Sequence, residues 1–422
     1  MTVMGRLAAA GRALFAPQAN TITTSEDLDK TWLRFGTESA SGQIVTDTTA
    51  MGLSAVYACV RVLSQTVSHL PLVLYRHAGD TRLPAESDKR FLLLKERPNE
   101  WQTSLEFREL LQKDVELRGN GYAYIVRGVG GVAVELIRMH PDCVAVDQDA
   151  ATLALKYTYT RKDGKRTELE RRNVFHLRGM GDDGVTGISP VRQHRNTIGD
   201  ALGLQTHGSK FFKNGARPSG VLDQEAGTKL SPESKKSLKE DFDDAYSGAE
   251  NAFKTLILPG GVTYKPLSIS MEDAQYIESR KLSVSEIARI YGVPPHKIGD
   301  LEKATFSNIE HQALEFVVDA IVPRVTRWEQ AIKRDLLAED QNLYAKHNLS
   351  ALLRGDAKSR AEALQIQRRN GVINANEWRE LEDMNPRTDD GGDGYIVEAN
   401  MRPDDGSDPL AGRNQNEPSQ TP

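Results

Sequence analysis

The alternation of hydrophobic and polar positions is most informative in residues 283–337, where two amphipathic helices flank a connector. The first helix ends at Gly292, because Pro294 lacks a backbone donor and restricts the residue before it. The second helix runs from about residue 308 to 337. Pro323 lies inside it and predicts a kink. Its apolar positions recur three or four residues apart along one face: Ile309, Ala313, Phe316, Val317, Ala320, Ile321, Val325, Trp328, Ile332 and Leu336.

The first part of the chain changes from helical to strand-like periodicity. Two helices are predicted, at residues 51–70 and 99–117, with apolar faces formed by Val56, Val60, Leu63, Val67 and by Leu105, Leu110, Leu111, Val115, Leu117. Strands are predicted at 72–75, 122–127, 132–138, 155–160, 167–169 and 173–178, with turns at 119–121, 128–131 and 163–164. Residues 51–188 therefore predict an α+β unit.

A helix, a small module and a second helix follow. Ser189 and Pro190 provide a helix cap and a first-turn proline, and one continuous helix is predicted from there to about Lys213, about 36 Å long. Residues 218–268 predict a strand, a helix at 232–246 and two further strands. The chain then returns through a helix at residues 271–292.

The two ends of the chain differ from its middle. Residues 1–50 predict an extended arm, whose start is weakly amphipathic and basic and is either frayed or bound to a partner. After residue 337, a strand at 342–349 and helices after Asp356 and from Asn376 to Met384 are expected. The tail beyond Asn385 is rich in acidic residues, glycine, proline and asparagine, a composition typical of disorder.

Charge and composition limit the classes of function. The net charge is −5, and all of it comes from residues 385–422, so residues 1–384 are formally neutral. Tight duplex-binding proteins carry a strongly basic face, whereas a conduit through which DNA slides needs little net attraction. No apolar run suits a membrane span or a secretory signal. The two cysteines, Cys59 and Cys143, suit a reducing compartment and predict small buried apolar residues.

None of the candidate catalytic motifs in the sequence meets the requirements of its site. The segment 203–210 reverses the lysine–hydroxyl order of a phosphate-binding loop and lies in a predicted helix. The glycines of 128–131 suit a hairpin turn, and Arg354-Gly355-Asp356 suits a helix cap. Nine histidines are scattered without metal-ligand spacing, and no nucleophile elbow occurs. No catalytic residue, metal or cofactor is therefore predicted.

Residues 287–310 carry a resemblance to a known family. The pattern I-A-x-x-Y-G-V-P-P-x-x-I-G at 287–299, the Thr-Phe-Ser-Asn-Ile-Glu step at 305–310 and a long helix with an internal proline resemble the signature of bacteriophage portal proteins. These are the head-to-tail connectors of tailed phages, here of the siphophage type. The order of elements over residues 51–384 is also similar to that of the family.

The resemblance implies a multi-domain α+β portal fold. In the family's terms, its segments are a flexible N-terminal arm (1–50), a wing (51–188), a stem helix (189–217), an α/β clip (218–268), a second stem helix (269–293), a tunnel loop (294–307), a kinked helix with a return to the wing (308–350), helices of a crown (351–384) and a disordered acidic tail (385–422).

The resemblance also implies three sets of site residues. The tunnel loop would contact DNA through Ile298, Leu301, Glu302, Lys303, Ala304, Thr305, Phe306 and Ser307; within its own chain Phe306 has no evident core to enter. The channel could be lined by Arg192, Arg195, Lys210 and Lys213, which could equally form salt bridges between subunits. The clip could meet a motor or adaptor through Lys235, Lys239, Glu240, Asp243 and Asp244, although such a charged run also suits a solvated helix face.

The function implied by the resemblance is structural. Twelve copies would form a ring at one capsid vertex of the virion, assembled in the host cytoplasm, through which double-stranded DNA is packaged and ejected without sequence preference. Expected partners are the terminase large subunit, which would hydrolyse ATP, a head-tail adaptor, the major capsid protein and the scaffold, with no membrane. The alternatives are another phage neck protein and a nucleotide-dependent DNA-processing enzyme.

Overall fold

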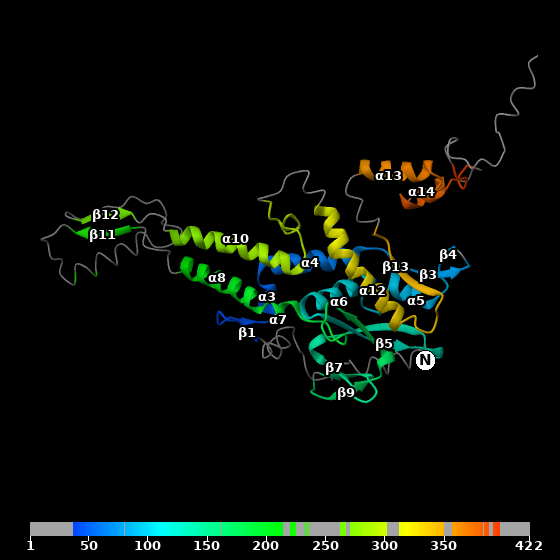
Figure 1. The fold of residues 1–422 in the computed structure, drawn as a ribbon, viewed down its shortest axis with the longest axis horizontal. Coiled ribbons are helices and arrows are strands. Elements are labelled where there is room, and N and C mark those ends of the chain that lie inside the picture. Colours follow the sequence, from blue (N-terminus) through cyan, green and yellow to red (C-terminus); the bar gives the residue numbers. More distant parts are fainter. Residues whose placement is uncertain are drawn as a thin grey trace, which may run out of the picture. The chain divides into compact units, whose positions relative to one another are not determined.

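The computed structural model describes residues 37–79, 81–161, 163–213, 220–224, 233, 236, 262–266, 271–301, 312–349, 357–382, 384–387 and 391–396 (Figure 1). The chain divides into two compact units, Met1–Asn348 and Leu349–Pro422. Helices and antiparallel sheets occur together in the first unit, which confirms the predicted α+β class. Within these ranges no helix has both the length and the apolar character needed to cross a membrane.

Two packed helices form the centre of the first unit. Helix α4 (Ser54–His69) buries its four predicted apolar positions and packs against α6 (Ser104–Arg118). Thr103 closes a capping box, so α6 begins at residue 104 and the start predicted at 99 is wrong. Leu105, a predicted apolar position of this helix, is exposed, and Phe107 is buried in the core.

The described part of the first unit contains three three-stranded antiparallel sheets, in the orders β10-β5-β6, β7-β8-β9 and β13-β3-β4. The strands predicted in residues 72–178 and at 342–349 are present, with ends shifted by up to three residues. They are β3 (Leu72–Ala78), β5 (Asn120–Arg127), β6 (Ala133–Met139), β8 (Leu155–Thr160), β9 (Arg166–Leu169), β10 (Val174–Arg178) and β13 (Leu343–His347). β13 pairs with β3, so a segment near residue 345 completes a sheet begun near residue 72.

Some short elements were not predicted from the sequence pattern. Helix α5 (Lys89–Lys95) and strands β4 (Thr81–Pro84) and β7 (Val144–Gln148) are too short for a period to emerge. The turn predicted at 119–121 is also wrong, because Asn120 and Gly121 belong to β5. Only Gly119 turns, as the left-handed cap of α6 (φ 77°) with the backbone of Ile188 against it.

The predicted extended arm is wrong for residues 37–50. Strands β1 (Thr37–Glu38) and β2 (Ile44–Val45) pair, and helix α3 (Asp47–Met51) follows with a capping box at Thr46. All three elements contact α8, described next. The hydroxyls that suggest an arm in the sequence are used here as caps and turn contacts.

The helix predicted from Ser189 is broken. Helix α7 (Pro190–Gln193) ends at His194 (φ −104°, ψ 29°), and α8 (Arg195–Lys213) begins immediately afterwards. Helix α10 (Met271–Tyr291) returns beside α8, as Figure 1 shows. Between them in sequence, β11 (Gly220–Gln224) pairs antiparallel with β12 (Val262–Pro266). The helix predicted at 232–246 lies outside the described residues, except for positions 233 and 236.

The helix after residue 312 buries most of its predicted apolar positions, but part of it is π-helical. A π-helix, η7 (Phe316–Ile321), precedes α12 (Val322–Asp335), and the N–H of Val322 donates to the carbonyl of Val317. Pro323 follows the π-helix closely, and the residues before it keep helical backbone angles, so it lies inside a continuous helix as predicted. The buried stripe comprises Phe316, Ala320, Ile321, Val325, Trp328, Ile332 and Leu336.

The second unit contains a pair of helices, α13 (Ala357–Arg369) and α14 (Ala375–Leu381). Asn374, not Asn376, caps α14, which ends before the predicted Met384. Asn376 instead bonds to the backbone of Arg387 and to the carboxylate of Asp393 (2.8 Å). The first described residues of the predicted disordered tail are therefore part of the folded unit.

Candidate functional site: the paired helices, their base and the following loop

Helices α8 and α10 pack against each other through small or apolar side chains. Near the base, Ile198 and Ala201 of α8 and Ile287 and Ala288 of α10 are buried. Further along, the hydroxyl of Tyr276 donates to the carbonyl of Leu204 (3.0 Å). The same hydroxyl lies where a side chain at position 208 would begin, so Gly208 permits this close approach.

The outer surface of this pair is polar with isolated apolar residues. Arg192 and Lys210 are exposed and Arg195 is half-buried. None of these three forms an ion pair with another residue that the structure describes. Their two predicted roles, facing DNA and pairing between subunits, therefore both stay predictions. The side chain of Lys213 lies outside the described residues, and Ile277 and Leu282 of α10 are exposed.

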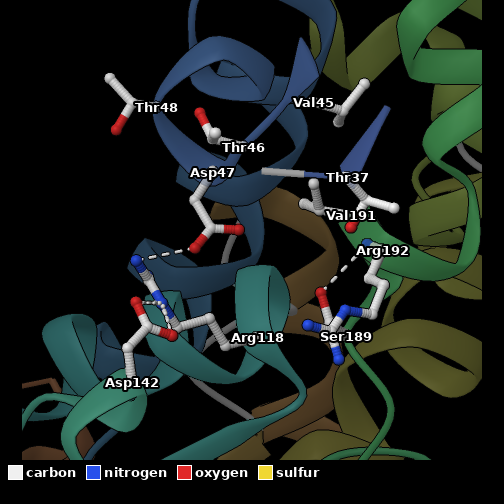
Figure 2. A pocket seen from close by; sticks show the side chains of 10 residues that line it. All are labelled: Thr37, Val45, Thr46, Asp47, Thr48, Arg118, Asp142, Ser189, Val191 and Arg192. Carbon is white, nitrogen blue, oxygen red and sulfur yellow. Dashed lines mark hydrogen bonds and ion pairs between the residues drawn. The ribbon is translucent and has the colours of Figure 1, made fainter. Parts of the chain in front are cut away.

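A cleft of about 190 Å³ lies at the base of the pair (Figure 2). Arg118 binds Asp47 of α3 (2.7 Å) and Asp142 (3.0 Å) within it, and the hydroxyl of Ser189 accepts from the backbone N–H of Arg192 (3.1 Å) and donates to the carbonyl of Leu117 (2.7 Å). Burial raises the pKa of Asp47 to about 6, although Arg118 opposes this shift. These contacts join residues 37–51 and the start of α7 to the end of α6.

Sequence reasoning missed this cluster apart from Ser189 and Arg192. The hydroxyl-rich run around Thr46 was a usable signal for a helix start, because Thr46 and Thr49 have capping-box spacing. The pairing of Asp47 with Arg118 had no sequence signal, since the two residues lie far apart in the chain.

The predicted loop is held at both ends. Gly292 (φ 66°) ends α10, Val293 is buried, and a single turn, η6 (Pro295–Ile298), closes at Gly299 (φ 90°). On the far side of residues 302–311, Gln312 Oε1 accepts a hydrogen bond from His296 Nδ1–H (2.8 Å). This hydrogen bond joins the turn after α10 to the first described residue of the following helix.

The ends of this loop expose apolar side chains. Leu301 is 62% exposed and Val318 60% exposed, and Leu314 is also exposed. Ile298 is half-buried. The remaining predicted loop residues, Glu302, Lys303, Ala304, Thr305, Phe306 and Ser307, lie outside the described residues. So do the predicted clip residues Lys235, Lys239, Glu240, Asp243 and Asp244.

Several titratable groups are buried in the first unit. His176 bonds to Tyr157 Oη and to Asn120 Oδ1 (both 3.0 Å), and burial lowers its pKa strongly. Cys59 and Cys143 are buried, as predicted, and burial raises the pKa of the Cys59 thiol to about 12, so it stays a thiol at neutral pH. Within the described ranges, no group of three or more His, Cys, Asp or Glu side chains could hold a metal ion.

Comparison with known proteins agrees with this arrangement. The family model described as "Phage portal protein" matches residues 54–383. The portal protein of Enterobacteria phage HK97 is 31% identical, over 87% of this chain and 88% of that protein. The probable portal protein of Streptomyces phage phiC31 is 33% identical, over 89% and 84%.

Solved structures give the same result for the fold. A chain in the neck of an empty gene transfer agent particle, computed with C6 symmetry, is 25% identical with a TM-score of 0.61, over 81% of this chain and 94% of that one. A chain in the neck of the native particle, computed with C12 symmetry, is 23% identical with a TM-score of 0.58, over 92% and 100%.

Proposed function

The chain belongs to the phage portal protein family, and from this premise we propose how its parts serve a ring at the capsid vertex of a virion. The ring is built from identical subunits, and we propose twelve of them. Double-stranded DNA enters through the centre during packaging and leaves through it on ejection, and the ring assembles in the host cytoplasm. The family is a structural one, and ATP hydrolysis belongs to a separate terminase in this proposal.

The loop between α10 and η7 carries the proposal. His296 Nδ1 donates to Gln312 Oε1, which joins the described segments before and after residues 302–311 and supports a loop with a fixed base. We assign DNA contact to Ile298, Leu301 and residues 302–307. The exposed apolar side chains of Leu301 and Leu314 at its ends suit contact with DNA or with neighbouring loops.

The other assignments follow the order of the elements. Residues 51–188 form the wing, α8 and α10 the stem, residues 218–268 the clip and residues 351–384 the crown. The clip, with Lys235, Lys239, Glu240, Asp243 and Asp244, docks the terminase large subunit and then the head-tail adaptor. The major capsid protein and the scaffold contact the ring from outside.

The loop is tested by in vitro packaging with procapsids that carry this chain. Replacing residues 302–307 by two glycines should shorten the packaged DNA while rings still assemble, because the stem and wing are untouched. Rings are counted by negative-stain microscopy and DNA length by gel. The double variant K303A/F306A should show the same defect, and Lys165→Ala, in an exposed hairpin turn, serves as the matched control. Full-length DNA with both loop variants would refute the loop's role.

The basic residues of the stem need a different test. Arg195→Gln and Lys210→Gln should change packaging or ejection and leave ring stability unchanged if these side chains face DNA. Weaker rings in high salt, with normal packaging by the rings that remain, would assign them to contacts between subunits and overturn the DNA-facing assignment.

A further inference from the structure

A groove of about 480 Å³ runs along the outer side of α4 and α6. The helices are antiparallel, because Arg108 near the start of α6 donates to the carbonyl of Leu70 at the end of α4 (2.8 Å). One end of the groove therefore has Trp101 and Glu106, and the other has Lys113 and Met51.

The groove has an incomplete apolar lining. Trp101 is 58% exposed and Tyr57 is 52% exposed, and both line it. Exposed aromatic side chains that gather around a concave surface mark a binding site. Val60 forms part of the floor and is buried.

The floor also contains a polar group without a partner. Ser64 lines the groove and is only 2% exposed, yet its hydroxyl has no hydrogen-bond partner. Buried hydroxyls are nearly always satisfied, so the groove lacks something that would meet this one. That second observation is independent of the exposed aromatic rings.

The charges of the groove give it a direction. Glu106 lies at the Trp101 end and Lys113 at the Met51 end, with Glu109 and Arg61 between them. A helix lying in the groove would be favoured with its positive N-terminal end near Glu106 and its negative C-terminal end near Lys113.

The start of this chain has the matching pattern. Its apolar positions recur three or four residues apart, and its two arginines, Arg6 and Arg12, are accompanied by no acidic residue before Glu26. Pro17 would end a helix after Phe15. The apolar positions are Met4, Leu7, Ala8, Gly11, Leu14 and Phe15.

We propose that residues 3–15 of this chain dock as a helix in the groove between its own α4 and α6. Met4 and Arg6 lie towards Trp101 and Glu106, and Phe15 lies towards Tyr57 and Lys113. The docked helix is about 20 Å long. With two glycines and so few residues it is marginal alone, so it forms on docking.

The connection between the helix and Thr37 fits this direction. Phe15 lies at the end of the groove that Met51 lines, and Met51 ends the α3 segment that follows Thr37 in the chain. Residues 16–36 can span up to about 70 Å when extended, far more than they need. The same chain can therefore supply its own occupant.

Engineered disulfides in the full chain test both the docking and its direction. Two matched pairs, M4C/Q65C and F15C/K113C, should form disulfides within one chain on mild oxidation. The swapped pairs, M4C/K113C and F15C/Q65C, serve as controls. The disulfide yield of the matched pairs should be roughly tenfold higher than that of the swapped pairs, because docking raises the effective concentration of the paired thiols. Mass spectrometry of peptides identifies the bonds.

A second variant tests whether the disulfides depend on the apolar face of the segment. L7D/L14D places charge on the apolar face of the segment only, so it should abolish the matched disulfides without changing the thermal stability of the body. Equal yields in matched and swapped pairs, disulfides only between chains, or yields that L7D/L14D leaves unchanged would each overturn the proposal.

Discussion

The body built on α4, α6 and α12 and the helix pair α8 and α10 are held by different kinds of contact. In the body, charged side chains pair in the interior: Arg324 with Glu116, Arg138 with Asp114 and Arg171 with Asp335, each at 2.6 Å and each with an acidic side chain at most 5% exposed. In the described part of the helix pair, the contacts include small and apolar side chains and the hydroxyl of Tyr276.

This difference predicts two kinds of mechanical behaviour. A buried carboxylate that loses its partner is costly, so the body has few alternative arrangements. The interface of the helix pair has weak directional preferences, so the helices can shift along each other at small cost. We expect the body to keep its shape and the pair to respond locally to substitution.

The largest effect should come from breaking a buried pair in the body. Arg324→Ala leaves Glu116 without its guanidinium and removes the contacts of Arg324 with the carbonyls of Ala320 and Tyr291, where α12 meets the end of α10. We expect a loss of about 3 kcal/mol in the free energy of unfolding, measured by urea denaturation.

Its matched control is an exposed pair. Arg172 binds Glu170 (2.7 Å), and both side chains are largely exposed, so Arg172→Ala should change the free energy of unfolding by less than about 0.5 kcal/mol. Equal effects of the two substitutions would contradict the distinction between interior and surface pairs.

A smaller and local effect is expected in the helix pair. In Gly208→Ala, the new methyl group displaces the Tyr276 hydroxyl from the Leu204 carbonyl. A cost of about 1–2 kcal/mol should remain after the gain in helix propensity. The rate of amide hydrogen exchange should rise in residues 271–285 and stay unchanged in α4 and α6.

Gly203 provides the control within the same helix. A methyl group there meets nothing closer than Gln43 Cγ at 4.0 Å. Gly203→Ala should therefore stabilise the protein by about 0.5–1 kcal/mol through helix propensity. Faster exchange in Gly203→Ala as well would show that the pair is sensitive to any change, not to the contact at Tyr276.

The smallest effect concerns the cleft where the two regions meet. The pKa of Asp47 is raised from 3.8 to about 6 by burial, so the folded state holds a proton that the unfolded state releases. This stabilisation is complete below pH 3.8 and is lost as pH rises through 6. Between pH 5 and pH 7 the wild type should lose about 1 kcal/mol relative to Asp47→Asn.

This pH dependence is measured by urea midpoints of both proteins at pH 5, 6 and 7. Asp149→Asn is the control, because hydrogen bonds from Lys156 and Thr152 lower the pKa of Asp149, so its carboxylate is ionised throughout this range. The difference between wild type and Asp149→Asn should stay constant. A constant difference for Asp47→Asn as well would mean that Arg118 holds Asp47 ionised.

The fold was largely predictable where an apolar period is long. The apolar faces of α4 and α12 are confirmed, because burial on one side of a regular helix leaves a repeat in the sequence. The strands β5 and β6 were found from their apolar residues and the turn between them, and both are buried on most positions. The helix break at His194 was not predictable, because neither glycine nor proline lies at that position. The π-helix also had no local signal beyond Pro323.

The sequence by itself determined the family, much of the order of the described elements and the start of the loop. That start was predictable because proline and glycine at 292–295 act through their own backbone limits. Only the tertiary structure decided that residues 37–51 are folded, that Asp47 meets Arg118, and that His296 contacts Gln312 across the loop. These pairings join residues distant in sequence. Their energy depends on burial and distance, which no local pattern encodes.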